Sequence, residues 1–134
     1  MAEVELGVAG LACRFPGAAD RHAFWENLLA KKVSISSVSP DRWDAGTFVS
    51  AEREAGKSVT SMAGWLPHID RFDFAYFKMS KKEALEMDPQ QRMAIEVSTE
   101  ALVDSGIELT QLQATRTGVF AGAGIAEFMG MSFR

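Results

Sequence analysis

The chain has 134 residues, of which 47% are hydrophobic and 24% are charged, and its formal net charge is -4 with a sequence pI of about 5.2. These values predict one small globular domain, covering residues 1–134, and argue against a disordered chain. They exclude the strongly basic surface that nucleic acids and anionic membranes select, so we expect neither as a partner.

No run of eighteen apolar residues occurs, and the first residues, MAEVE, lack the basic start and long apolar region of a secretory signal. We therefore expect a soluble, cytoplasmic protein. Its one cysteine, Cys13, can form neither a disulfide within the chain nor a cysteine metal cluster, which agrees with a reducing compartment.

The first predicted elements are a strand and a helix. Residues 4–11 form a continuous apolar run, which is typical of a strand buried on both faces and favours an α/β fold. After a turn at residues 16–19, Asp20 is a candidate N-cap for a helix over residues 21–30. That helix carries apolar residues four apart, such as Phe24 and Leu28, on one face.

Residues 33–64 are rich in serine, glycine and charge and show no steady periodicity, so they predict a long surface segment. We expect the aromatic rings of Trp43 and Phe48 to hold it down. The next segment, residues 69–77, contains four aromatic residues. Because aromatic side chains carry large burial energies, this segment predicts a core-facing turn rather than a platform for a ligand.

Two helix starts follow each other closely. Ser80 and Glu83 have the spacing of a capping box and predict a short helix. Asp88 and Pro89 have the N-cap and first-turn residue types of a second helix.

The second of these helices is the best-defined element of the sequence. Met93, Val97 and Ala101 recur every fourth residue along it, and Gly106 predicts its end. After it, residues 117–124 predict a second buried strand, and residues 125–134 form an apolar tail.

Two strands are too few for a stable sheet in water, so this chain should expose open sheet edges and a large apolar patch. Something is expected to cover that surface: a second copy of the chain, a longer polypeptide that completes the fold, or a rearranged tail. The predicted interface comprises Leu6, Val8, Val119, Phe120, Phe128, Met129, Met131 and Phe133.

The residues that could carry chemistry are sparse. Cys13 has no histidine near it in sequence, and His22 and His68 lack the spacing of metal ligands. The glycines of residues 117–124 are not followed by the lysine and hydroxyl residue of a phosphate-binding loop, so close backbone packing explains them better. We therefore predict no catalytic residue, no metal site and no cofactor in this chain.

Six sequence blocks, taken together, resemble the N-terminal portion of the β-ketoacyl synthase (ketosynthase) domains of modular polyketide synthases, a branch of the thiolase-fold condensing enzymes. The blocks are GLACRFPGA at 10–18, FWENL at 24–28, PDRW at 40–43, IDRFD at 69–73, MDPQQR at 87–92 and TGVFAG at 117–122. The resemblance implies an incomplete thiolase-like α/β fold, in which a few parallel or mixed strands pack with helices.

The resemblance also implies where the family's chemistry lies. Its nucleophilic cysteine, two histidines and supporting lysine all fall beyond residue 134, and Cys13 matches a position that is not catalytic. We therefore expect a truncated domain that is not an enzyme as an isolated chain, although its family consists of acyltransferases.

Three functional hypotheses follow. The first is a non-catalytic ketosynthase-like module that acts as a docking or adaptor piece in a polyketide assembly line, with a synthase polypeptide or a second copy as its partner and a carrier protein as a further candidate. The second is half of a split β-ketoacyl synthase, for which another chain supplies the Cys-His-His site. The third is an excerpt of a longer synthase without a separate role.

Overall fold

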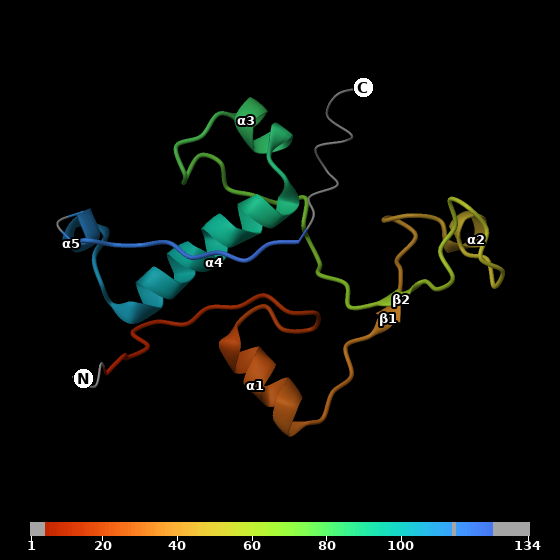
Figure 1. The fold of residues 1–134 in the computed structure, drawn as a ribbon, viewed down its shortest axis with the longest axis horizontal. Helices are drawn as coiled ribbons and strands as arrows, with labels where there is room; N and C mark the ends of the chain where they lie inside the picture. The colour runs from red at the N-terminus through yellow and green to blue at the C-terminus, as the bar shows by residue number, and fades with distance from the viewer. Residues whose placement is uncertain (1–4, 114, 125–134) are drawn as a thin grey trace. The chain divides into compact units, whose positions relative to one another are not determined.

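The structure is a computed structural model that describes residues 5–113 and 115–124. The chain divides into two compact units, traced in Figure 1. Unit 1 comprises Met1–Ala12 and His68–Arg134, and unit 2 comprises Cys13–Pro67. The architecture is mixed helix and sheet, as expected from the sequence, and the assignment of residues 1–134 to one domain stays a prediction.

Unit 2 contains the first helix, α1, over Arg21–Leu29. The sequence placed this helix correctly to within one residue. Asp20 caps it, because its Oδ1 accepts hydrogen bonds from the backbone N–H groups of His22 at 2.8 Å and Ala23 at 2.9 Å.

The C-terminal end of α1 is a Schellman motif built on a lysine. The Lys31 N–H donates to the Leu28 carbonyl at 3.1 Å, and the Lys32 N–H donates to the Asn27 carbonyl at 2.9 Å. This arrangement places Lys31 in the left-handed region, with a φ of 53°. Glycine is the usual residue here, because a Cβ is strained in that conformation.

The segment predicted as a long surface loop holds three short elements. β1 (Ser36–Ser37) pairs antiparallel with β2 (Met62–Ala63), and Ser36 lies opposite Ala63. Between them, the four-residue helix α2 (Ala45–Phe48) begins after Asp44, whose side chain accepts from the Gly46 N–H. In Figure 1 these elements lie in the part of the ribbon that runs from orange at β1 through yellow at α2 to yellow-green at β2.

Aromatic contacts hold this segment, as the sequence predicted. The Trp43 ring makes edge contacts with Phe48 and with Trp65, each at 6.4 Å between ring centroids. The Arg42 guanidinium lies 5.8 Å from the centroid of Trp65 and also donates to the Leu66 carbonyl. These side-chain contacts supplement the backbone pairing of β1 with β2, next to which the Val38 N–H donates to the Ser61 carbonyl at 2.8 Å.

Unit 1 contains the two helices whose starts the sequence predicted. Helix α3 (Lys81–Glu86) opens with a complete capping box between Ser80 and Glu83. Helix α4 (Pro89–Ser105) follows the N-cap Asp88 and ends at Gly106, which has a φ of 70°. A short helix, α5 (Leu109–Gln113), was not foreseen.

The aromatic segment at 69–77 forms its own cluster. The rings of Phe72 and Phe77 stack with centroids 5.1 Å apart, and Tyr76 contacts Phe77 edge-on at 4.9 Å. The prediction that the segment faces a core is wrong for Tyr76, whose side chain is 63% exposed. Its phenol can keep its contact with water while one ring edge packs on Phe77.

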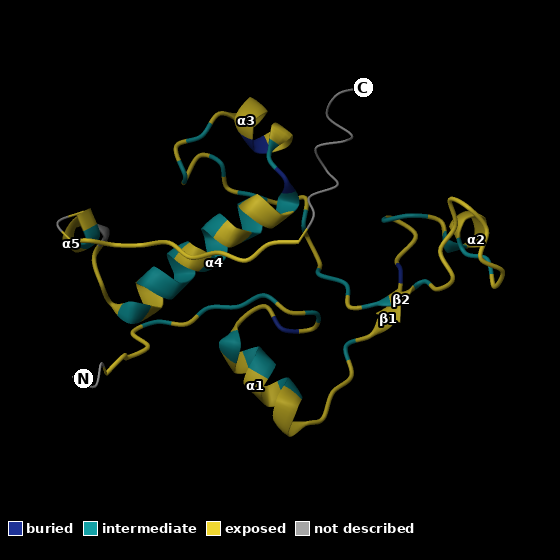
Figure 2. Cartoon of the chain, in the orientation of Figure 1, coloured by how far each residue is buried: buried dark blue, intermediate teal, exposed yellow. Residues whose placement is uncertain are grey.

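Few side chains are fully buried in the part of the chain that the structure describes. Buried apolar residues there are Ala18, Val38 and Ala84, and Asp88 is the buried polar one. Figure 2 shows them as short dark segments in a ribbon that is otherwise teal or yellow. All three apolar residues are small or medium-sized, so local caps and turns contribute a large share of the order in each unit.

The two predicted strands are absent, and this is the main correction to the sequence-based expectation. The ribbon of residues 5–11 and 117–124 is drawn out in Figure 1, but these residues belong to no strand. Apolar runs predict strands only where a neighbouring strand pairs with the backbone N–H and C=O groups. Within the described residues, neither segment has such a neighbour.

The two left-handed helix ends generate a pair of opposite predictions. Gly106→Ala adds a Cβ in open space, so only backbone strain acts, and it should lower the free energy of unfolding by about 1 kcal/mol. Lys31→Gly removes the corresponding strain and should raise it by about 0.5–1 kcal/mol. Urea titrations followed by circular dichroism would measure both, and changes of the same sign would contradict the assigned backbone geometry.

Helix caps should also make stability depend on pH. A hydrogen bond from the Ala23 N–H lowers the pKa of Asp20 below 3.8, and hydrogen bonds from Ser80 lower the pKa of Glu83 below 4.5. Because the folded-state pKa values lie below the unfolded ones, these caps contribute above pH 4.5 and are lost as pH falls through the folded values. Asp20→Asn keeps the cap but cannot titrate, so acid melts of this variant should show a smaller loss between pH 5 and pH 3 than wild type.

Candidate partner-binding surface

The first extended segment is fixed to α4 at one end. A Cβ on Gly10 would lie 2.1 Å from the Ala101 carbonyl oxygen and 2.8 Å from the Ser105 backbone nitrogen. The adjacent Leu11 N–H donates to Oδ2 of Asp104 at 3.0 Å. Glycine therefore permits a backbone approach that no other residue would allow, and α4 positions the segment.

The other end of this segment is open to solvent. The side chains of Leu6 and Val8 are 92% and 87% exposed. Among the described residues, none forms a backbone hydrogen bond with residues 5–9. The segment thus presents apolar side chains together with free backbone donors and acceptors, the combination that a pairing strand would satisfy.

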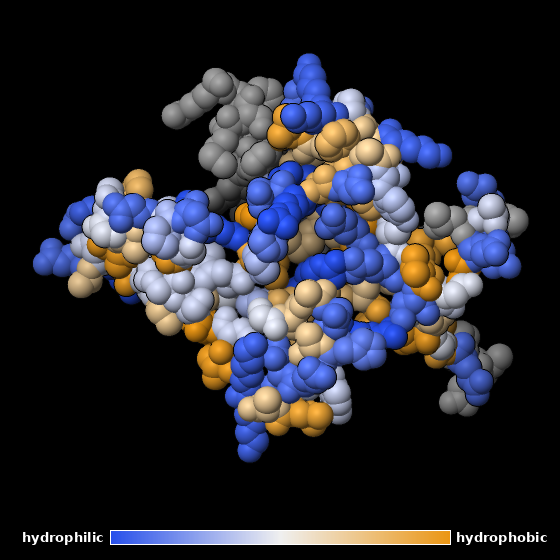
Figure 3. Space-filling view, turned by 180° about the vertical axis from the view of Figure 1, so that it is seen from behind, coloured by the Kyte–Doolittle hydropathy of each residue, from blue (hydrophilic) through white to orange (hydrophobic). Residues whose placement is uncertain are grey.

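The second extended segment has the same properties. Val119 is 90% exposed and Phe120 is 99% exposed. Residues 116–124 make no backbone hydrogen bond with any other described residue. Figure 3 shows one face of the molecule, on which hydrophobic side chains (orange) reach the surface between hydrophilic ones.

The structure places four of the eight predicted interface residues. Leu6, Val8, Val119 and Phe120 are all exposed, but no backbone hydrogen bond joins the two segments to each other. The other four, Phe128, Met129, Met131 and Phe133, lie outside the described residues. We call the segments 5–9 and 117–124 the open segments.

Sequence reasoning found the apolar face of α1 but did not foresee its exposure. Its face carries Trp25, Leu28 and Leu29, and each of these side chains is more than half exposed. The half-buried Phe24 instead packs against Phe15, with ring centroids 4.5 Å apart. The fourfold spacing of apolar residues identified this face in the sequence but could not tell whether this chain covers it.

The residues that could carry chemistry, Cys13, His22 and His68, are divided between the two units. Cys13 is half-buried and free, and within unit 2 no hydrogen bond joins its thiol to the imidazole of His22. In unit 1, His68 is exposed and has a left-handed backbone with a φ of 55°, which fits a turn between elements. That this chain supplies no catalytic residue stays a prediction.

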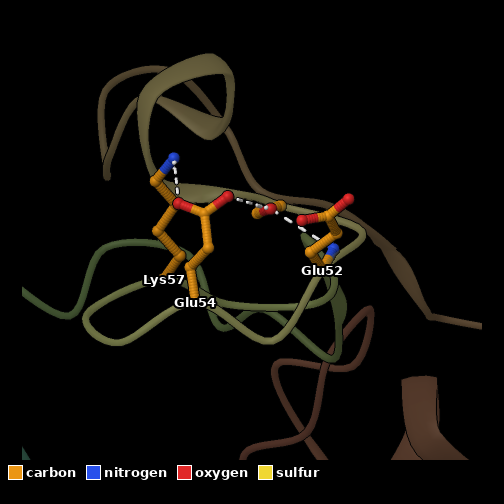
Figure 4. A network of polar contacts seen from close by, with 4 residues as sticks. Glu52, Glu54 and Lys57 are labelled. Atoms are coloured by element: carbon orange, nitrogen blue, oxygen red, sulfur yellow. Dashed lines mark hydrogen bonds and ion pairs between the residues drawn. The ribbon is translucent and has the colours of Figure 1, made fainter.

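A cluster of polar side chains in unit 2 orders a turn. In the loop after α2, Ser50 donates to Glu54 at 2.9 Å and accepts from the Glu52 N–H, while Lys57 forms an ion pair with Glu54 at 2.9 Å (Figure 4). These exposed contacts order a turn that contains Gly56, with a φ of 78°. No set of three or more metal-binding side chains gathers in the part of the chain described, and no helix there is long and apolar enough to cross a membrane.

Comparison with known proteins supplies the context for this surface. Residues 5–133 match the model of the family "Beta-ketoacyl synthase, N-terminal domain". The chain is 41% identical over 128 residues to a phenolphthiocerol/phthiocerol polyketide synthase of Mycobacterium tuberculosis, covering 94% of this chain and 8% of the relative. It is 37% identical over 124 residues to the polyketide synthase ThaG of Burkholderia thailandensis, covering 92% of this chain and 2% of that protein.

Solved structures agree with this family. An oxazolomycin ketosynthase domain from Streptomyces albus aligns with a TM-score of 0.79 and 37% identity, covering 84% of this chain and 20% of the domain. A ketosynthase from module 6 of the bacillaene synthase from Bacillus subtilis aligns with a TM-score of 0.68 and 28% identity, covering 77% of this chain and 17% of the other. The chain therefore spans a small fraction of the length of each of these proteins, and its fold is part of a thiolase-like ketosynthase fold.

The contact between Gly10 and α4 can be tested with a matched pair of variants. Gly10→Val should lower the free energy of unfolding by about 1–3 kcal/mol, because the new side chain collides with helix backbone. Gly7→Val, in the same segment, meets no atom within 4 Å and should change stability by less than about 0.5 kcal/mol. Urea denaturation measures both, and equal losses would contradict the anchoring of this segment on α4.

Proposed function

This chain belongs to the β-ketoacyl synthase N-terminal domain family, and we propose that it works in a polyketide synthase by associating with the remaining part of a ketosynthase, without supplying the nucleophile itself. In this role it is a docking or adaptor piece. The observation that carries the proposal is the exposure of Leu6, Val8, Val119 and Phe120 on two extended segments without backbone partners.

The energetics favour association over exposure. Burying an aliphatic or aromatic side chain of this size stabilises by about 1.5–3 kcal/mol, and four such side chains lie in the open segments. An added strand would also satisfy backbone groups that only water can now reach. The two effects act at the same place, so a neighbouring strand is the partner that best fits these segments.

The lengths of the ketosynthase neighbours support one source for such a strand. The oxazolomycin ketosynthase domain has 80% of its chain outside the part that aligns with this protein, since the alignment covers 20% of it. The missing neighbours of the open segments would belong to that larger part. The proposal holds whether that part is on the same polypeptide or on another one.

The side chains of the described residues support the adaptor role. Condensing enzymes of this family transfer an acyl group to a cysteine thiolate and stabilise an enolate with histidines. Here Cys13 is half-buried, and among the described residues of unit 2 its thiol has no hydrogen bond to an imidazole. We propose that the nucleophile and its bases come from the complementary part.

A second candidate function has support from the backbone itself. The TM-score of 0.79 with a ketosynthase domain means that most of the chain follows the path of an enzyme domain. Association with a complementary chain would then restore a condensing site, as in a split β-ketoacyl synthase. The adaptor and split-enzyme functions share the interface and differ in whether the complex transfers acyl groups.

Association should be measured with the full chain and the non-aligning part of the Streptomyces albus ketosynthase domain. We expect a one-to-one complex by light scattering. Phe120→Asp should weaken it by about tenfold or more, since a charge in an apolar interface loses its hydration. Val33→Asp, at a 77% exposed site outside the open segments, is the control and should bind like wild type.

Two results would contradict the proposed association: no complex with wild type, or equal binding by Phe120→Asp and wild type. Acyl transfer from a carrier-bound thioester then separates the two functions. Transfer by the complex supports the split enzyme, and a stable complex without transfer supports the adaptor. Because a carrier protein is a further candidate partner, its binding to the chain alone is measured in the same experiments.

A further inference from the structure

The backbone donor that follows the open segment 5–9 is bonded to a side chain. The Leu11 N–H donates to Oδ2 of Asp104 at 3.0 Å, although 93 positions of sequence separate the two residues. Both belong to unit 1, and Asp104 is next to the last residue of α4. At the edge of a sheet, such an N–H would be open to a neighbouring strand. Here the carboxylate of Asp104 takes that place.

The position of Asp104 on α4 would be unfavourable by itself. A carboxylate near the C-terminal end of a helix meets the negative end of the helix dipole. The Asp104 side chain is also exposed, so it contributes no burial energy. Its bond from the Leu11 N–H is charge-assisted and offsets part of this penalty. The carboxylate thus has a stabilising contact at a site where the helix alone disfavours it.

Strand geometry says which other backbone groups would share the edge that Asp104 occupies. When a segment pairs in a β-sheet, the N–H and C=O groups of alternate residues point to the same neighbouring strand. Counting back from Leu11, the residues on that side are Ala9, Gly7 and Glu5. They are exposed and form no backbone hydrogen bond with another described residue. A strand on this side can therefore pair with residues 5–9 and meets Asp104 at residue 11.

We propose that Asp104 is the register stop of the interface, the group at which the pairing of an incoming strand ends. The strand comes from the complementary part of the ketosynthase and pairs with Glu5, Gly7 and Ala9. This inference rests on the proposed function and gives the association its edge and its end. The occupant is a strand, because the groups left open along this edge are backbone donors and acceptors.

A stop matters because residues 5–10 specify register weakly by themselves. The segment has glycine at positions 7 and 10 and alanine at position 9. Strands rich in glycine are prone to slip, and a slip by one residue turns every side chain to the other face. A partner strand that slipped past Ala9 would bring a carbonyl beside the Asp104 carboxylate, where the Leu11 N–H is already bonded. That carbonyl would lose its hydration without gaining a donor, so the slipped pairing is disfavoured.

Amide hydrogen exchange, resolved by NMR, tests the edge. The probe is the non-aligning part of the Streptomyces albus ketosynthase domain. In its complex with the full chain, the amides of Gly7 and Ala9 should exchange at least about tenfold more slowly than in the chain alone. Protection of Leu6 and Val8 without protection of Gly7 and Ala9 would overturn the inference, because the strand would then lie on the opposite edge.

Two variants of Asp104 test the stop. Asp104→Ala removes the acceptor, so the Leu11 amide of the chain alone should exchange about two- to tenfold faster than in wild type. In the complex of this variant, the partner strand should run past Ala9 and protect Leu11 again. Asp104→Asn keeps an acceptor oxygen and should exchange like wild type. The stop is refuted if Leu11 of Asp104→Ala stays as unprotected in the complex as in the chain alone.

Light scattering of the chain alone identifies the other possible occupant. A dimer in which Gly7 and Ala9 are protected without the complementary part would place a second copy on this edge. That result would overturn the partner assigned here.

Absence of any wild-type complex would contradict the proposed function instead. Asp104 is then judged in one continuous polypeptide that joins this chain to the same complementary part. There Gly7 and Ala9 must be protected relative to the chain alone, and Asp104→Ala must leave Leu11 more protected than it is in the variant chain alone. Unprotected amides in the joined protein overturn the inference.

Discussion

Backbone hydrogen bonding is the constraint on which the arrangement of this chain depends. A helix pairs its N–H and C=O groups internally, so α1, α3 and α4 form wherever a cap and an apolar stripe coincide. A strand has no internal partner. The open segments therefore stay extended and exposed, although their composition is that of strands.

The same constraint connects the fold to its proposed role. Gly10 and Leu11 fasten one open segment to α4, and Leu6 and Val8 continue from that anchor into solvent. An anchored segment with free backbone groups loses little further freedom when a strand pairs with it, so association costs less entropy than it would for a loose tail. Helix α4 would thus hold the apolar edge in place for a pairing strand.

Local features could be predicted well from sequence, because each depends on residues within one or two turns. Asp20, the capping box of Ser80 and Glu83, and the stop at Gly106 all occur where side-chain chemistry and spacing placed them. The Schellman end at Lys31 escaped prediction, since no glycine marks it. The family could also be recognised, because six ordered blocks extend over most of the chain.

Sequence alone determined helices α1, α3 and α4, the caps at their N-terminal ends and the kinship with ketosynthases, since these depend on side-chain types at fixed spacing. Tertiary structure decided whether an apolar run becomes a strand, whether the face of α1 is covered, and which group accepts from the Leu11 N–H. Each of these depends on a partner that is distant in the sequence or on another part of the protein. The local pattern of residue types does not reveal whether that partner is present.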